Sequence, residues 1–153
     1  MSSYAYEVLV CGGAGCLSSG CQEIKERIEA ELDASGLKEK VRLTLTGCMG
    51  PCGMGPSVVV QPGGYFYQKV KPEDATDIVR EHLLGGRPVV RLMVTDPSTD
   101  AVQPTMEDIP FFNKQQRIVL RNCGIIDPLR LEDYTGRDGY KALHKCITGM
   151  ARE

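Results

Sequence analysis

The chain has 153 residues, and its hydrophobic content of 42% and charged content of 25% are typical of a soluble globular protein. Its 18 basic and 20 acidic side chains give a net charge of −2, which predicts neither a nucleic-acid partner nor a membrane partner. No apolar run is long enough for a membrane span, and the N-terminal residues lack the basic and apolar regions of a signal peptide. We therefore expect a cytoplasmic protein.

The first elements along the chain are a strand, a helix and a second strand. Residues 4–10 and 40–46 show strand patterns, and a helix is expected from Ser18 or Ser19, as its cap, to about Ser35. The apolar face of this helix follows steps of three and four residues and consists of Cys21, Ile24, Ile28 and Leu32. This order of elements favours a right-handed crossover between two parallel strands.

A hairpin and a second helix follow. We expect strands at residues 57–61 and 65–70 on either side of a Pro-Gly-Gly turn, and a helix that Pro72 opens and a Gly-Gly pair ends. The order β-α-β-β-β-α predicts an α/β fold of the thioredoxin-like type, and we assign it to residues 1–92. Pro56 stands where such folds often carry a cis proline, whereas the general rarity of cis bonds favours trans.

The remaining residues differ in composition. Residues 93–115 contain three prolines and little periodicity, which predicts a linker that follows the surface through its apolar side chains Ile109, Phe111 and Phe112. Residues 116–153 are too few for an independent core and are interpreted as the truncated start of a second α/β domain. Within them we expect a strand at 117–123, a short helix capped at Asp127-Pro128, and a helix after Asp138 with Tyr140, Leu143 and Ile147 directed inward.

Four of the seven cysteines form two close pairs in glycine-rich loops. Cys11 and Cys16 are separated by four residues, and Cys48 and Cys52 by three. Each pair follows one of the two predicted parallel strands, whose carboxyl ends meet at one edge of the sheet. The sequence therefore predicts that the four thiols lie close together.

This arrangement leaves several kinds of site open. Thiol–disulfide catalysis normally uses two residues between its cysteines, while structural zinc tolerates both spacings. A 2Fe–2S cluster needs four thiolates, which two pairs supply. The remaining alternative is four free thiols buried for packing alone, against which the placement of both pairs in loops argues. Around a cluster, backbone N–H groups would be directed at sulfur from Gly12, Gly13, Gly15, Gly50 and Gly53. No acid–base catalyst is expected, and His82 and His144 are predicted to lie on helix surfaces.

The motifs TGCMGPCGMGP, YFYQKVKPEDATDIVREHLLGGRPV, IPFFNKQQRIVLRNCGIIDP and YTGRDGYKALHK together resemble a known family. They are similar to the NADH-binding flavoprotein (beta-type) subunits of soluble NAD(P)-linked and electron-bifurcating hydrogenases, which are related to the complex I flavoprotein subunit. The resemblance implies an N-terminal thioredoxin-like 2Fe–2S ferredoxin domain whose ligands map onto Cys11, Cys16, Cys48 and Cys52. Cys21, Cys123 and Cys146 match no ligand position.

The resemblance also implies a wider setting. FMN and NAD(P) would be bound only in a downstream domain that this chain lacks, so the chain would be a fragment without a hydride-transfer site. Its partners would be other subunits of a multimeric hydrogenase or NADH-oxidising complex, with a homodimer as a further possibility. The expected function is one-electron transfer through the cluster. The alternatives are a metal-free or zinc-bearing docking scaffold and a thiol-redox protein.

Overall fold

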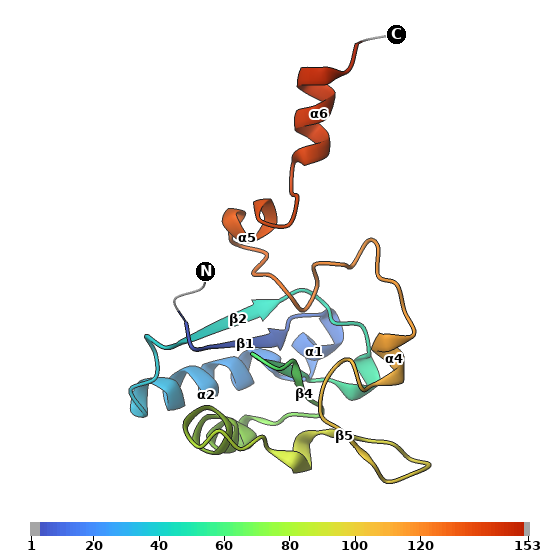
Figure 1. The fold of residues 1–153 in the computed structure, drawn as a ribbon. Helices are drawn as coiled ribbons and strands as arrows, with labels where there is room; N and C mark the ends of the chain where they lie inside the picture. The colour runs from blue at the N-terminus through green and yellow to red at the C-terminus, as the bar shows by residue number, and fades with distance from the viewer. Residues whose placement is uncertain (1–3, 152–153) are drawn as a thin grey trace.

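A four-stranded mixed sheet forms the centre of the computed structural model, which describes residues 4–151. Its strands are β1 (Tyr6–Cys11), β2 (Val41–Thr46), β3 (Val58–Gln61) and β4 (Tyr65–Tyr67), in the order β2-β1-β3-β4 (Figure 1). β1 runs parallel to β2, whereas β3 is antiparallel to both β1 and β4. The predicted parallel pair and the predicted hairpin are therefore confirmed, and so is the α/β fold class.

The predicted first helix is divided into two. A short helix α1 (Ala14–Ser18) is followed by α2 (Cys21–Ala34), and the break lies at Gly20, whose φ of 87° requires the left-handed region that glycine tolerates. No serine side chain caps α2, so the expected cap at Ser18 or Ser19 is wrong. The Ser18 hydroxyl instead donates a hydrogen bond to the Gly15 carbonyl within α1, at 3.0 Å.

The second predicted helix is present but irregular. It consists of a 3-10 turn η2 (Pro72–Asp74), a short α3 (Ala75–Asp77) and a π-helical segment η3 (Ile78–Leu84). The Asp74 carboxylate caps its start by accepting the Lys71 N–H at 2.8 Å. Figure 1 shows this segment and α2 on the same side of the sheet, and the two pack against each other.

The core lies between this helical layer and the central strands. β1 and β3 contribute uninterrupted buried runs because both of their faces are covered, and the apolar face of α2 is buried as predicted. The buried side chains of these three elements include Val8, Leu9, Val10, Val58, Val59, Val60, Cys21, Ile24, Ile28 and Leu32. The peptide bonds Gly55–Pro56 and Gln61–Pro62 are cis. Pro56 therefore has the cis bond that thioredoxin-like folds often carry there, and not the trans bond that the rarity of cis bonds favoured.

His82 is buried, which overturns its expected place on a helix surface. It is 3% exposed, and its Nδ1 lies 2.7 Å from the Tyr67 hydroxyl, which also accepts a hydrogen bond from the Val89 N–H at 3.0 Å. The ring of Tyr65 meets the imidazole edge-on, with 4.8 Å between the ring centroids. Burial lowers the pKa of His82 below its usual value. His144, in contrast, is exposed as predicted.

Residues 90–113 contain several short elements rather than a featureless linker. These are η4 (Val90–Leu92), β5 (Val94–Thr95), β6 (Val102–Gln103) and α4 (Pro110–Asn113). The segment follows the surface through apolar side chains, because Ile109 is 1% exposed and Phe112 packs on the core, while Phe111 is exposed. The division of the chain into domains remains a prediction.

The C-terminal residues differ most from expectation. Residues 117–123 form turns instead of a strand, and Ile118 and Val119 are 74% and 92% exposed, because no neighbouring strand among residues 4–151 pairs with them. The first helix here is α5 (Leu131–Thr135), so the predicted cap at Asp127-Pro128 is wrong. The Asp127 carboxylate instead accepts a hydrogen bond from the Leu129 N–H in the turn before the helix.

The last helix, α6 (Lys141–Gly149), extends away from the sheet in Figure 1. Leu143 and Ile147 of this helix and Tyr140, which precedes it, are exposed, so their predicted inward orientation is wrong. Among the described residues, no helix combines the length and the apolar character that crossing a membrane requires.

Candidate metal centre

Parallel pairing brings the two cysteine loops to the same edge of the sheet. Cys11 is the last residue of β1 and lies in register with Thr46, the last residue of β2. After β1 the chain turns into α1, which carries Cys16. After β2 it enters the loop that carries Cys48. Cys52 begins the short helix η1 (Cys52–Met54) at the end of that loop.

The four predicted ligands surround one small cavity. The volume of this cavity is about 10 Å³, and the residues that line it are Cys11, Cys16, Cys48, Cys52, Gly13, Gly15, Gly50, Pro51 and Ser57. The thiols of Cys16 and Cys48 each share a hydrogen bond with the Cys11 thiol. Two loops that are more than thirty residues apart in the sequence thus place their sulfur atoms together.

The four cysteines differ in their access to solvent. Cys11 and Cys16 are buried, Cys48 is half-buried and Cys52 is exposed. Burial, with smaller contributions from Cys11, raises the pKa of the Cys16 thiol to about 12, and burial also raises the pKa of Cys48. The site therefore has a protected side at β1 and α1 and an open side at Cys52.

Backbone N–H groups point at three of the four sulfur atoms. The Met49 N–H lies 3.5 Å from the Cys11 sulfur, the Gly50 N–H donates to Cys48, and the Ser57 N–H donates to Cys16. Only the Gly50 donor was among the glycines named from the sequence, because a backbone donor leaves no signature in residue type. The Gly12 N–H is directed elsewhere, to the Thr46 carbonyl at 2.9 Å.

Close packing explains why small residues surround the thiols. A Cβ atom on Gly13 would lie 2.9 Å from the Cys48 sulfur, and one on Gly55 would lie 2.7 Å from the Cys16 sulfur. Both separations are shorter than real Cβ contacts. Gly12 and Gly53, in contrast, are not among the residues that line the cavity.

The donor set suits an iron–sulfur cluster by its chemistry. Four cysteine thiols and no carboxylate or imidazole line the cavity, and as thiolates they would supply the two soft ligands per iron that a 2Fe–2S centre needs. Across residues 4–151, no three Cys, His, Asp or Glu side chains already have the geometry of a bound metal ion. Convergence of the four thiols on one cavity, with N–H groups directed at sulfur, is the evidence for the fit.

The other three cysteines lie outside this cavity. Cys21 is fully buried on the core face of α2, and burial raises the pKa of its thiol. Cys123 is half-buried, and its sulfur lies against Gly47, next to the loop that carries Cys48. Cys146 is exposed on α6.

Comparison with known proteins identifies related sequences and a related fold. Residues 3–83 match the family model of the thioredoxin-like 2Fe–2S ferredoxins. A 2Fe–2S ferredoxin of Clostridium pasteurianum is 40% identical over 79 residues, which are 52% of this chain and 78% of that protein. A 2Fe–2S ferredoxin of Aquifex aeolicus is 57% identical over 53 residues, 35% of this chain and 48% of the relative, so that match spans under half of the relative's length.

Two further matches concern structure and a larger protein. The crystal structure of the wild-type thioredoxin-like 2Fe–2S ferredoxin from Aquifex aeolicus has a TM-score of 0.55 and 37% identity, covering 61% of this chain and 100% of that chain. The NADP-reducing hydrogenase subunit HndC of Solidesulfovibrio fructosivorans is 51% identical over 35 residues, 23% of this chain and 7% of the subunit.

Proposed function

The chain belongs to the thioredoxin-like 2Fe–2S ferredoxin family, and from this premise we propose that Cys11, Cys16, Cys48 and Cys52 hold one 2Fe–2S cluster that carries single electrons. When bound, the cluster supplies one-electron chemistry, which no side chain near the site provides. The chain itself supplies four thiolates, donors to their sulfur atoms and a shell that limits the access of water on the β1 side.

The single observation that supports this assignment is the shared cavity of the four thiols. Their unequal exposure also suits electron transfer, because Cys52 is exposed while Cys11 and Cys16 are buried. The loops contribute no charged residue at 11–21 or at 47–58. A partner could therefore bring its own redox centre close to Cys52 without first having to desolvate charges of these loops.

The assembly in which this transfer takes place is a further part of the proposal. We place the chain in a multisubunit NAD(P)-linked hydrogenase or NADH-oxidising complex, with FMN and NAD(P) bound by a domain beyond the residues of this chain. Support comes from the short match to the hydrogenase subunit HndC. The cytoplasmic location and a homodimer of this chain remain predictions.

Anaerobic purification followed by metal analysis tests the cluster. The expected result is a red-brown protein with about two irons and two sulfides per chain, and an electron paramagnetic resonance signal after reduction by dithionite. A colourless protein with one zinc ion per chain would contradict the proposal in favour of a docking scaffold. A Cys48–Cys52 disulfide that forms and breaks during turnover would indicate thiol-redox chemistry instead.

A further inference from the structure

A segment after the ferredoxin-like core lies against the loop that carries Cys48. This segment, residues 111–126, is called the strap below. The matched solved ferredoxin covers 61% of this chain, and the family model ends at residue 83, so the strap lies outside the region that defines the family. In Figure 1 it runs from α4 across the end of the sheet toward α5.

Hydrogen bonds join the strap to the end of β2 at a buried side chain. Thr46 is 2% exposed, and its hydroxyl accepts a hydrogen bond from the Gly124 N–H at 3.1 Å. The same hydroxyl donates to the Ile126 carbonyl at 2.9 Å. The Thr46 hydroxyl thus both donates to the strap and accepts from it. Thr46 stands two residues before Cys48, so these bonds attach the strap close to a proposed ligand.

Three close contacts extend this attachment along the loop. At three glycines, the neighbouring side chain comes so close that it would almost touch an added Cβ atom. A Cβ atom on Gly47 would lie 3.0 Å from the Cys123 sulfur, and a Cβ atom on Gly124 would lie 3.2 Å from the Met49 side chain. A Cβ atom on Gly50 would lie 3.1 Å from the Phe111 ring. Met49 is 1% exposed, and its N–H is the group directed at the Cys11 sulfur. The strap therefore packs against a residue that donates to a proposed cluster ligand.

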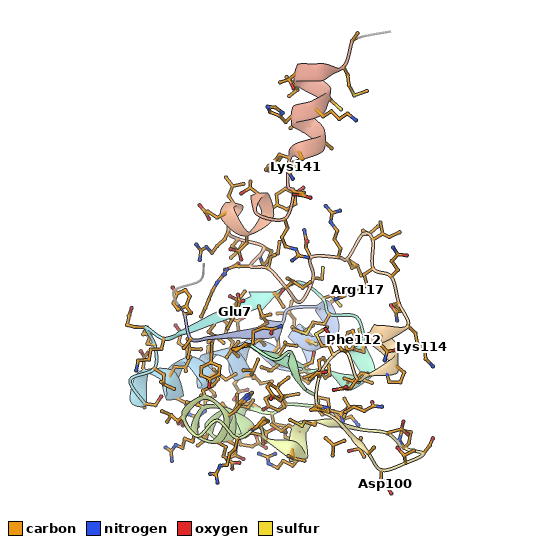
Figure 2. The ribbon with its side chains drawn as sticks, viewed as in Figure 1. Glu7, Asp100, Phe112, Lys114, Arg117 and Lys141 are labelled. Atoms are coloured by element: carbon orange, nitrogen blue, oxygen red, sulfur yellow. The ribbon has the colours of Figure 1, made fainter. Side chains whose placement is uncertain are left out.

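One set of contacts lies within the strap, and another lies just beyond its C-terminal end. Arg117 donates to the Cys123 carbonyl at 3.1 Å and lies over the Phe112 ring, 6.0 Å from its centroid. Figure 2 marks Phe112 and Arg117 on the side of the molecule where α4 leads into the strap. Beyond residue 126, the Arg42 guanidinium of β2 lies 2.5 Å from Asp133 and 3.8 Å from Asp127.

The pKa of Asp133 reflects this ion pair. Burial alone would raise it, but hydrogen bonds from Arg42 and from the Asp127 N–H outweigh burial and lower it. The attachment next to the strap is thus a charged contact with β2.

We infer that residues Phe111, Cys123 and Gly124 are positioning residues for the metal centre, which hold the loop 46–50 closed over the Cys48 side of the cluster. The role of these residues toward a cluster rests on the proposed function. Their contacts with the loop do not depend on it. The strap restricts opening of the loop and keeps the Met49 N–H directed at sulfur, and it leaves Cys52 as the open edge for electron transfer.

Hydrogen–deuterium exchange of the full chain tests the contact itself. In Gly124→Val, a β-branched side chain must adopt a φ of 76° and displace Met49. We expect the amides of residues 47–50 and of Cys52 to exchange about tenfold faster, equivalent to about 1.4 kcal/mol, as for loss of buried hydrogen bonds. Val119→Ala is the matched control, because Val119 lies in the strap and is 92% exposed. Equal loop exchange in the two variants would overturn the inference.

A second variant removes the attachment from the other side. Thr46→Val preserves shape while it removes the hydroxyl, and with Gly124→Val it forms a double-mutant cycle. If both act on one contact, the combined variant should open the loop no further than the stronger single variant, while α2 exchanges at the wild-type rate. Fully multiplicative effects would show two unrelated defects and contradict the inference.

Transfer of iron to a chelator links the strap to the cluster. In the loaded protein, Gly124→Val should release iron about tenfold faster than Val119→Ala. Wild-type protein without iron would contradict the proposed function alone, since loop exchange can still be measured. Loaded protein whose loop opens faster but whose iron release is unchanged would contradict the role of the strap.

Discussion

Individual cysteines differ in what their removal should do. Cys11, Cys16, Cys48 and Cys52 line one cavity, whereas Cys21 is buried in the core. We expect each single Cys→Ser change among the four to abolish or strongly destabilise the cluster, because iron–sulfur assembly selects thiolate. Iron per chain and the visible spectrum are the measurements.

Cys21→Ser and Cys146→Ser are the controls for this set. Both should retain the full iron content, since neither side chain lines the cavity. The ligand assignment is wrong if Cys21→Ser loses the cluster while Cys16→Ser retains it.

Buried His82 should make stability depend on pH. Because burial lowers its pKa in the folded state, the unfolded chain binds a proton first as the pH falls through about 6.5. The contribution of neutral His82 is complete above that value and is lost as the pH falls toward the lower folded pKa. Urea unfolding of the wild type should show this loss as the pH falls below about 6.5.

His82→Gln should reduce the steepness of this dependence by up to about 1.4 kcal/mol per pH unit. His144→Gln is the matched control, because His144 is exposed, and it should leave the wild-type dependence unchanged. An unaltered profile in His82→Gln would show that another group titrates.

Thr44 in β2 offers a stabilising substitution. It is 3% exposed, and within residues 4–151 its hydroxyl oxygen has no hydrogen-bond partner. Thr44→Val should therefore raise the free energy of unfolding, by about 1 kcal/mol, because an unsatisfied buried hydroxyl is replaced by a methyl group of similar shape. Chemical denaturation measures the change, and a lower midpoint than that of the wild type would contradict it.

At the scale of elements, the two loops form a site only because they approach each other closely. Gly13→Ala would place a Cβ 2.9 Å from the Cys48 sulfur and force the loops apart, whereas a Cβ on Gly53 meets no atom within 4 Å. We expect Gly13→Ala to lower cluster occupancy several-fold, while Gly53→Ala retains it. Iron per chain after parallel purification decides between them, and equal occupancy would contradict the close approach.

For the whole molecule, electron transfer is expected without hydride transfer. Hydride chemistry requires a flavin beside a nicotinamide and a loop that binds phosphate, and the glycines of the first loop that could serve there, Gly13 and Gly15, line the thiol site. We predict that dithionite bleaches the purified chain, that NADH leaves its spectrum unchanged, and that no flavin co-purifies. Stoichiometric flavin, or sustained dye reduction with NADH, would reveal a further site in residues 116–153.

Local patterns in the sequence determined much of this protein. Alternating and continuous apolar segments, with a turn between the last two, located the four strands, and helical spacing located the buried face of α2. Parallel strand order placed Cys11 and Cys48 at one edge. These inferences succeeded because the side-chain patterns depend on residues that are neighbours in the chain, and because a strand–helix–strand segment generally connects two parallel strands. The family follows from the same segment, residues 3–83.

Only the tertiary structure decided the features that depend on distant partners. The buried His82 beside Tyr67, the N–H of Met49 at Cys11 and the contact of Gly124 with Thr46 join residues far apart in the sequence. Residues 117–123 have the composition of a strand, but a strand needs an adjacent strand to pair with, and composition cannot supply one. Side-chain pattern records which residues avoid water, whereas their contacts are set by how the whole chain packs.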